Sequence, residues 1–163
     1  MPDLWPALPR WEWIEATHAQ EFPGLVHLDA TMGAAAGTLA GRAAYLATPY
    51  TAYARAADGG FDARGGERAA RLSAMWLAEA LEAGVAAHCP VIASHVAVVQ
   101  GACVLDPLDG AAWESLNAPV LAACAGVVVP PIDRWRGSAG IWREVGATLR
   151  WQRPVFVIGE GWG

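Results

Sequence analysis

The 163-residue sequence has few charged side chains and no surplus of basic ones. Charged residues make up 17% of the chain, hydrophobic residues 55%, and the formal net charge is −5. Proteins that coat nucleic acids or bind anionic membranes recruit Lys and Arg to phosphate groups, so this balance argues against both classes. A small anionic ligand needs only a local group of donors and stays possible. The apolar fraction and the length are those of one packed globular domain.

The sequence also lacks the patterns of metal sites, disulfides, leader peptides and membrane spans. Cys89, Cys103 and Cys124 are odd in number and show neither CxxC nor a His/Cys metal spacing. Their apolar neighbours indicate buried free thiols in a reducing compartment. Met1–Trp13 mixes Pro, Trp and charge, unlike a leader peptide, and no apolar run approaches the ~20 residues that span a bilayer. We expect a soluble cytoplasmic protein without a metal or cofactor.

The first forty residues differ from the rest of the chain. Trp5, Trp11 and Trp13 alternate with prolines and predict an irregular, aromatic-rich arm. Such a cluster favours a hydrophobic anchor, for instance onto a partner subunit, over a ligand stack. Leu25–Leu28 predicts a short strand. Met32–Gly41 is rich in glycine but has no GKS or GKT ending of a phosphate loop, so we interpret it as a connector.

From residue 42 onward, short apolar runs alternate with helical patterns. They predict strands over Ala43–Ala47, Val85–Ile92, Gly126–Val129 and Pro154–Ile158, and helices over Glu67–Ala83, Gly110–Ala123 and Ser138–Arg150. Pro90 should confine regular pairing to the first half of its strand. Tyr53–Gly66 is expected to be a mobile loop, and Ser94–Asp109 a loop with some strand. We predict an arm and connector over residues 1–41 and an α/β domain with a parallel sheet over residues 42–163.

Polar segments follow three of the predicted strands. They are Thr48–Thr51, Ser94-His95 and Asp133–Ser138. In open parallel sheets the ligand lies beyond the carboxyl ends of the strands. We therefore expect these segments to converge on one edge of the sheet and to form the site.

The segment around Ser138 carries the most information. Ser138 is a plausible N-cap, and the free amide groups that follow it would face the ligand edge. Gly140 leaves room beside the helix, and Glu144 lies one turn later, with its carboxylate directed at the sheet edge. A carboxylate in that position is costly unless it is used or paired. Glu144 is thus equally well a functional group or the partner of an ordinary ion pair with Arg136, Arg143 or Arg150.

Other side chains near this edge also have two interpretations. His95 could act as a base, although a single histidine in an apolar segment is more often simply hydrogen-bonded. Tyr45 and Tyr50 could stack on a base, although tyrosines beside strands usually belong to the core. Arg134 and Arg136 could clamp a phosphate, although solvated arginines are commoner.

These residues form a pattern that resembles a known family. Tyr45–Thr51 resembles the "YLAxPYs" motif of the DUF1937 family, which is related to nucleoside 2-deoxyribosyltransferases and to nucleotide N-hydrolases of the same fold. Gly84, Pro90 and Ser94-His95 match its "G…sPisxSH" segment in spacing, and Trp135–Glu144 resembles its "gWrdSxGixxE" signature. The resemblance extends from residue 42 to the C-terminus. It implies a flavodoxin-like three-layer sandwich with a five-stranded parallel sheet.

The resemblance also implies roles for individual residues. Glu144 would attack the anomeric carbon of a sugar and form a glycosyl-enzyme intermediate. Ser138 would bind a 5′-phosphate at the helix N-terminus. The relatives carry an aspartate that helps the base to leave, and Asn117 stands there in this sequence, with Ala125 in place of a second acid. Asn117 can hydrogen-bond a base but cannot donate a proton as a general acid, a role open to Asp106, Asp109 or Glu114.

The sequence therefore predicts a nucleoside or nucleotide N-glycosyl enzyme, either a transferase or a hydrolase. The expected catalytic residues are Glu144 and Asn117, and the expected substrate-binding residues are Tyr45, Thr48, Pro49, Tyr50, Ser94, His95, Arg136, Ser138 and Gly140. Its partner would be a small nucleoside or nucleotide, and the resemblance implies a homo-oligomer. One alternative is a non-catalytic nucleotide-binding module. Another is an assembly protein that docks through its Trp-rich arm.

Overall fold

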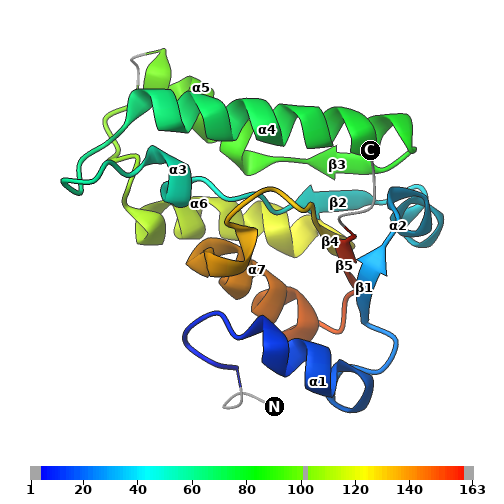
Figure 1. The fold of residues 1–163 in the computed structure, drawn as a ribbon. Coiled ribbons are helices and arrows are strands. Elements are labelled where there is room, and N and C mark those ends of the chain that lie inside the picture. Colours follow the sequence, from blue (N-terminus) through cyan, green and yellow to red (C-terminus); the bar gives the residue numbers. More distant parts are fainter. Residues whose placement is uncertain (1–4, 101–102, 160–163) are drawn as a thin grey trace.

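A five-stranded parallel β-sheet lies at the centre of the protein (Figure 1). The structure is a computed structural model and describes residues 5–100 and 103–159. The strands are β1 (Val26–Ala30), β2 (Ala43–Leu46), β3 (Ala86–His88), β4 (Gly126–Val129) and β5 (Val155–Ile158). All four neighbouring pairs are parallel, in the order β1-β5-β4-β2-β3. The predicted parallel sheet and three-layer sandwich are confirmed.

The origin of the first strand distinguishes this sheet from the ordinary flavodoxin-like arrangement, in which the spatial order is 2-1-3-4-5. Strands β2, β3, β4 and β5 fill the places of strands 1 to 4 in that order. The fifth place is taken by β1, which comes from the N-terminal end of the chain and pairs with β5. Residues 1–41 therefore contribute an edge strand to the sheet that the rest of the chain builds.

Helices cover both faces of the sheet. Side chains alternate between the two faces along each strand, and since β2, β4 and β5 are apolar throughout, both faces have to be buried. One face packs against α1 (Trp11–Glu21), α6 (Gly110–Ala123) and α7 (Ala139–Arg150), and buries Tyr45 and Val127. The other packs against α2 (Met32–Leu39), α4 (Ala63–Glu82) and α5 (Pro90–Val99), and buries Leu46 and Val128. In Figure 1, α4 and α5 lie above the sheet, and α1, α6 and α7 lie below it.

The segment after β3 differs from the prediction. Strand β3 ends at His88, and Pro90 opens helix α5 instead of interrupting a strand. A proline suits the first turn of a helix because its missing N–H has no partner there in any case. Ser94 and His95 therefore lie on a helix, and the loop expected over residues 94–109 begins only after Val99. Five β-branched residues in α5 made the segment resemble a strand, whereas packing against α4 keeps it helical.

The expected mobile loop at residues 53–66 is also largely ordered. A short helix, α3 (Thr51–Ala54), follows β2, and α4 begins at Ala63. The Asp62 side chain caps α4, and the Asp62 amide donates to the carbonyl of Ala54 at 2.7 Å. Gly65 allows the first turn of α4 to approach the backbone of α3 closely, because a Cβ at position 65 would overlap the carbonyl oxygen of Tyr53.

The N-terminal arm is not irregular throughout, and its aromatic rings pack against their own chain. Helix α1 begins at Trp11, whose ring is buried against Trp135 and Trp142 of the other end of the domain. Trp5 stacks on Trp142 with the ring centroids 4.4 Å apart. The connector predicted after the first strand is a helix, α2. The tryptophans are thus an anchor, as predicted, but within the same subunit.

Two further observations concern the classes of site considered from the sequence. Within residues 5–100 and 103–159, no helix is long and apolar enough to cross a membrane. In the same ranges, no three His, Cys, Asp or Glu side chains gather closely enough to hold a metal ion. Cys89 and Cys124 are buried free thiols, as predicted, and their burial raises the pKa of both, whereas the free thiol Cys103 is only partly buried.

Candidate functional site

A cavity of about 650 Å³ opens at the carboxyl ends of β2 and β4. The chain leaves β2 toward β3 on one side and returns to β4 on the other, so this is the point where the strand order reverses. Ligands of doubly wound sheets bind at such a point. Eight of the predicted site residues line the cavity: Tyr45, Thr48, Tyr50, Ser94, Asn117, Ser138, Gly140 and Glu144.

Glu144 lies in this cavity on the second turn of α7. The Tyr45 hydroxyl donates a hydrogen bond of 2.6 Å to Oε1 of Glu144 across the gap between β2 and α7. Of the three arginines that could have paired with this carboxylate, Arg136 binds Glu15, Arg143 binds Glu114, and no described ion pair joins Arg150 to Glu144. Among the described contacts, Glu144 is therefore held by a neutral hydroxyl and not by an ordinary ion pair.

The surroundings of Glu144 make its proton labile near neutral pH. Burial raises the pKa of Glu144 to about 7, and the negative charge of Glu114 acts in the same direction. The hydrogen bond from Tyr45 and the charge of Arg143 oppose this rise. Burial also raises the pKa of Tyr45, which keeps its hydroxyl protonated as a donor. A carboxyl group perturbed in this way within a cavity is typical of functional sites.

Replacement of Glu144 by Gln should stabilise the protein, increasingly so as the pH rises. Between about pH 4.5 and 7 the unfolded chain ionises this group before the folded protein does, so the wild type loses stability there. The substituted amide would not titrate and can still accept from Tyr45. The advantage of Glu144→Gln should grow from near zero at pH 4.5 to about 1–3 kcal/mol at pH 8, after allowance for partial exposure. Urea denaturation of both proteins at intervals across this pH range measures the difference in their free energies of unfolding. A difference that stays constant with pH would refute the prediction.

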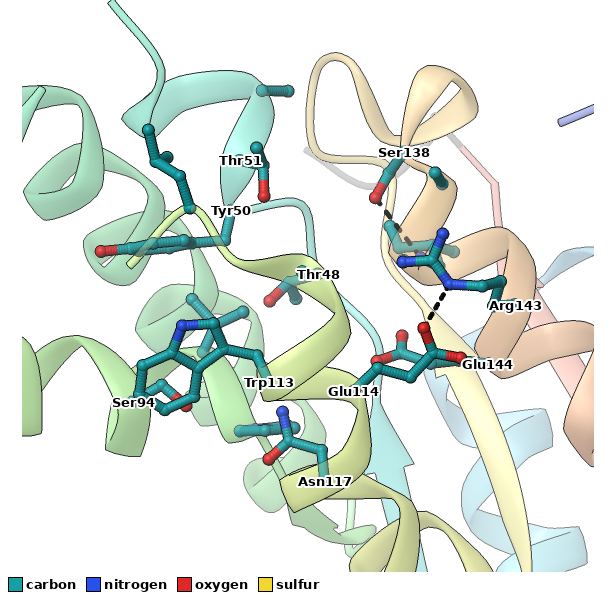
Figure 2. A pocket seen from close by; sticks show the side chains of 18 of the residues that line it. Thr48, Tyr50, Thr51, Ser94, Trp113, Glu114, Asn117, Ser138, Arg143 and Glu144 are labelled. Carbon is teal, nitrogen blue, oxygen red and sulfur yellow. Dashed lines mark hydrogen bonds and ion pairs between the residues drawn. The ribbon is translucent and has the colours of Figure 1, made fainter. Parts of the chain in front are cut away.

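The N-terminus of α7 forms the second part of the site. Ser138 is its N-cap, and Oγ accepts from the amide of Ile141 at 3.4 Å, as the sequence predicted. Gly137 and Gly140 also line the cavity, so backbone amides of the first turn are open to it. Figure 2 shows the Arg143 guanidinium between Ser138 and the two acidic side chains. This end of the cavity is suited to an anion.

Helix α6 supplies the third part, which the sequence identified through Asn117 and, as one of three possible general acids, Glu114. Trp113, Glu114 and Asn117 share one helix face and line the cavity. The Trp113 indole is fixed by a 2.9 Å hydrogen bond to the carbonyl of Asp106. Glu114 binds Arg143, with 2.6 Å between Oε2 and Nε. The spacing to Asn117 would have indicated Trp113 and Glu114, since residues three or four apart lie on one face of a helix.

Comparison with known proteins bears on the family but not on an activity. Residues 42–160 match the DUF1937 family, described as a domain of unknown function. The chain belongs to the DUF1937 family. No curated protein and no solved structure shows a significant match. The matched region includes four of the five strands, whereas α1, β1 and α2 lie outside it.

Three predicted site residues of this DUF1937 domain do not line the cavity. Pro49 is buried and is not part of the cavity lining, and Arg136 pairs with Glu15 of α1 at 2.8 Å. His95 is buried beneath Tyr50, with Nδ1 3.1 Å from the Tyr50 hydroxyl and Nε2 3.0 Å from Glu67. The simply hydrogen-bonded interpretation of His95 therefore fits the structure, and its effect on the cavity passes through Tyr50.

The acids that could replace the missing aspartate can now be distinguished by position. Asp109 caps α6, accepting from the amides of Ala111 and Ala112 at 3.1 Å each. Asp106 accepts from the amide of Leu108 at 2.8 Å in the preceding turn. Glu114 alone of the three lines the cavity.

Proposed function

We propose that this protein is a nucleoside or nucleotide N-glycosyl enzyme, a transferase or a hydrolase, with Glu144 as its nucleophile. The observation that carries the proposal is the contact between Tyr45 and Glu144 inside the cavity. It orients a carboxylate at the ligand edge of the sheet with a neutral donor, and among the described contacts no arginine forms a direct ion pair with it. This is the arrangement that attack on an anomeric carbon requires.

In the proposed reaction, Glu144 displaces a base from C1′ of the sugar. Tyr45 binds Oε1, which leaves Oε2 as the attacking atom. A bond forms between Oε2 and C1′, the bond from C1′ to the base nitrogen breaks, and its electron pair leaves with the base, which takes up a proton. The negative charge of the carboxylate stabilises the oxocarbenium-like transition state. Water or a second base then attacks C1′ and releases Glu144.

The remaining walls of the cavity support a nucleotide as the ligand. A volume of about 650 Å³ lies in the range of small-molecule sites. The rings of Tyr50 and Trp113 and the apolar side chains of Val91 and Val98 offer a surface for a flat base. The α7 N-terminus at the other end offers donors for a phosphate or a sugar hydroxyl.

The direct test is incubation of the purified protein with deoxynucleosides and their 5′-monophosphates, followed by chromatographic measurement of free base. Addition of a second base separates a transferase, which forms a new nucleoside, from a hydrolase. The competing proposal, a non-catalytic nucleotide-binding module, predicts thermal stabilisation by nucleotides without release of base. If the protein neither binds nor cleaves any member of this set, both proposals are refuted.

Tyr45→Phe should reduce the turnover number about 10- to 100-fold while the protein stays folded. The substitution keeps the buried ring and removes only the hydroxyl that orients Glu144. Because that hydrogen bond lowers the pKa of Glu144, its loss should also raise this pKa further above 7. The acidic limb of the pH–rate profile should then move to higher pH. A lower rate with an unmoved limb would contradict the assigned role of Tyr45.

The assembly role and the oligomeric state remain separate proposals. The tryptophans that would have docked onto a partner pack inside their own subunit, which removes the sequence argument for an assembly protein. A homo-oligomer is still what the family resemblance implies, and the cytoplasmic location stays a prediction from the composition of the sequence. Analytical ultracentrifugation measures the oligomeric state directly.

A further inference from the structure

The proposed reaction needs a proton for the leaving base, and the cavity holds a second carboxyl group that could supply it. Glu114 and Glu144 lie side by side, on α6 and α7 respectively (Figure 2). The two are close enough for the charge of Glu114 to act on Glu144. Asn117, one turn further along α6, has an amide and cannot donate a proton as an acid. Glu114 is therefore the acidic group placed to face a base that Glu144 displaces.

Arg143 controls the access of Glu114 to this role. Its Nε lies 2.6 Å from Oε2 of Glu114, and the same guanidinium faces Ser138 at the α7 N-terminus. An anionic group of a ligand bound at that N-terminus would compete for the guanidinium. Both partners of the ion pair are about half-exposed, so the pair is held weakly and can exchange partners. Release of Arg143 would leave the Glu114 carboxyl group free to turn toward the leaving base.

We propose that Glu114 is the proton donor to the leaving base, and that an anionic group of the substrate releases it by drawing Arg143 away. This inference rests on the proposed function and deepens it by naming the second catalytic group. Once Arg143 has moved away, Glu114 takes up a proton from solvent, and in the first step this proton passes to the base nitrogen as the bond to C1′ breaks. In the second step the Glu114 carboxylate takes a proton from the attacking water or base, which restores the starting state.

The experiment compares leaving groups in wild type and Glu114→Gln. With a natural base, loss of a general acid should lower the turnover number about 10²-fold or more. With a base that departs without needing a proton, the turnover number of the variant should stay within about 5-fold of wild type. For a purine substrate this base is 7-methylguanine, and for a pyrimidine substrate it is 5-nitrouracil. Glu82→Gln, an exposed acid at the end of α4, is the matched charge control and should behave as wild type.

Arg143→Met separates a chemical role of Glu114 from a structural one. If Glu114 only holds Arg143 in place, Glu114→Gln and Arg143→Met should lower activity in the same way, and the loss should be equal for natural and activated leaving groups. That result would overturn the proposed role of Glu114. We expect the two variants to affect different kinetic constants. Arg143→Met should raise KM for a 5′-monophosphate about 10-fold and change the turnover number little, while Glu114→Gln changes turnover and little else. Equal circular dichroism spectra show that both variants fold.

The outcomes also separate this inference from the proposed function. If wild type releases no base from any substrate, the proposed function fails and the role of Glu114 fails with it. If wild type releases base and Glu114→Gln does so equally fast from natural and activated substrates, only the role of Glu114 is overturned.

Discussion

Glu144→Gln should lower the rate of N-glycosidic cleavage by about 10³-fold or more without disturbing the fold. An amide has the shape of the carboxylate and can keep the hydrogen bond from Tyr45, but it carries no charge and is a very poor nucleophile. The loss falls on the chemical step, so the turnover number should drop while KM changes little. The size of the effect follows from removal of both the covalent route and the anion that faces the oxocarbenium-like transition state.

Single-turnover measurement with wild type, Glu144→Gln and Glu82→Gln tests this expectation. Rapid acid quench of the wild type should also trap the intermediate, and the peptide that contains Glu144 should then gain the mass of the sugar. A Glu144→Gln variant with more than about a tenth of wild-type activity would remove Glu144 as the nucleophile.

Trp11→Ala should lower the free energy of unfolding by about 3–5 kcal/mol, the usual cost of removing a buried aromatic ring. Only 3% of Trp11 is exposed, and its ring packs between Trp135 and Trp142. The substitution also removes the indole donor that binds the carbonyl of Arg136 at 3.0 Å. That carbonyl lies in the turn before Ser138, so the variant should loosen the loop that leads into the candidate site.

The melting temperature of Trp11→Ala should fall by about 10 °C, since 1 kcal/mol corresponds to roughly 2–4 °C in a domain of this size. Trp151→Ala is the matched control, because 42% of Trp151 is exposed and its contact is with Arg153. It should cost less than about 1 kcal/mol. Equal melting temperatures for the two variants would show that residues before the family match are dispensable for the fold.

Much of the fold could be predicted because its signals are local. The strands at Gly126–Val129 and Pro154–Ile158 are short β-branched runs bounded by turn residues, and both occur where expected. The helix over Glu67–Ala83 ends before Gly84, whose φ of 88° suits the left-handed position after a helix. The site at Ser138 and Glu144 followed from helix spacing in the same way, because a cap and a turn of helix fix their relative positions.

The features that sequence reasoning missed depend on contacts between distant segments. Helix α5 contains many β-branched residues, and only its packing against α4 outweighs their preference for strands. The tryptophans of the arm gave no indication of their partners, which lie more than a hundred positions later. Likewise, the pairing of Arg143 with Glu114 joins two helices whose relative register no local pattern specifies.

The position of β1 has a consequence for the order in which the chain folds. Val26 pairs with Val155, so β1 has no neighbour in the sheet until β5, the last of the five strands in chain order, has been made. Strands β2, β3 and β4 can pair earlier, because they are neighbours in the sheet and all precede residue 130. Such distant pairing is slow, and the aromatic arm stays uncovered in the meantime. Nascent chains that stop before β5 should therefore bind chaperones through this arm and release them once the last strand emerges.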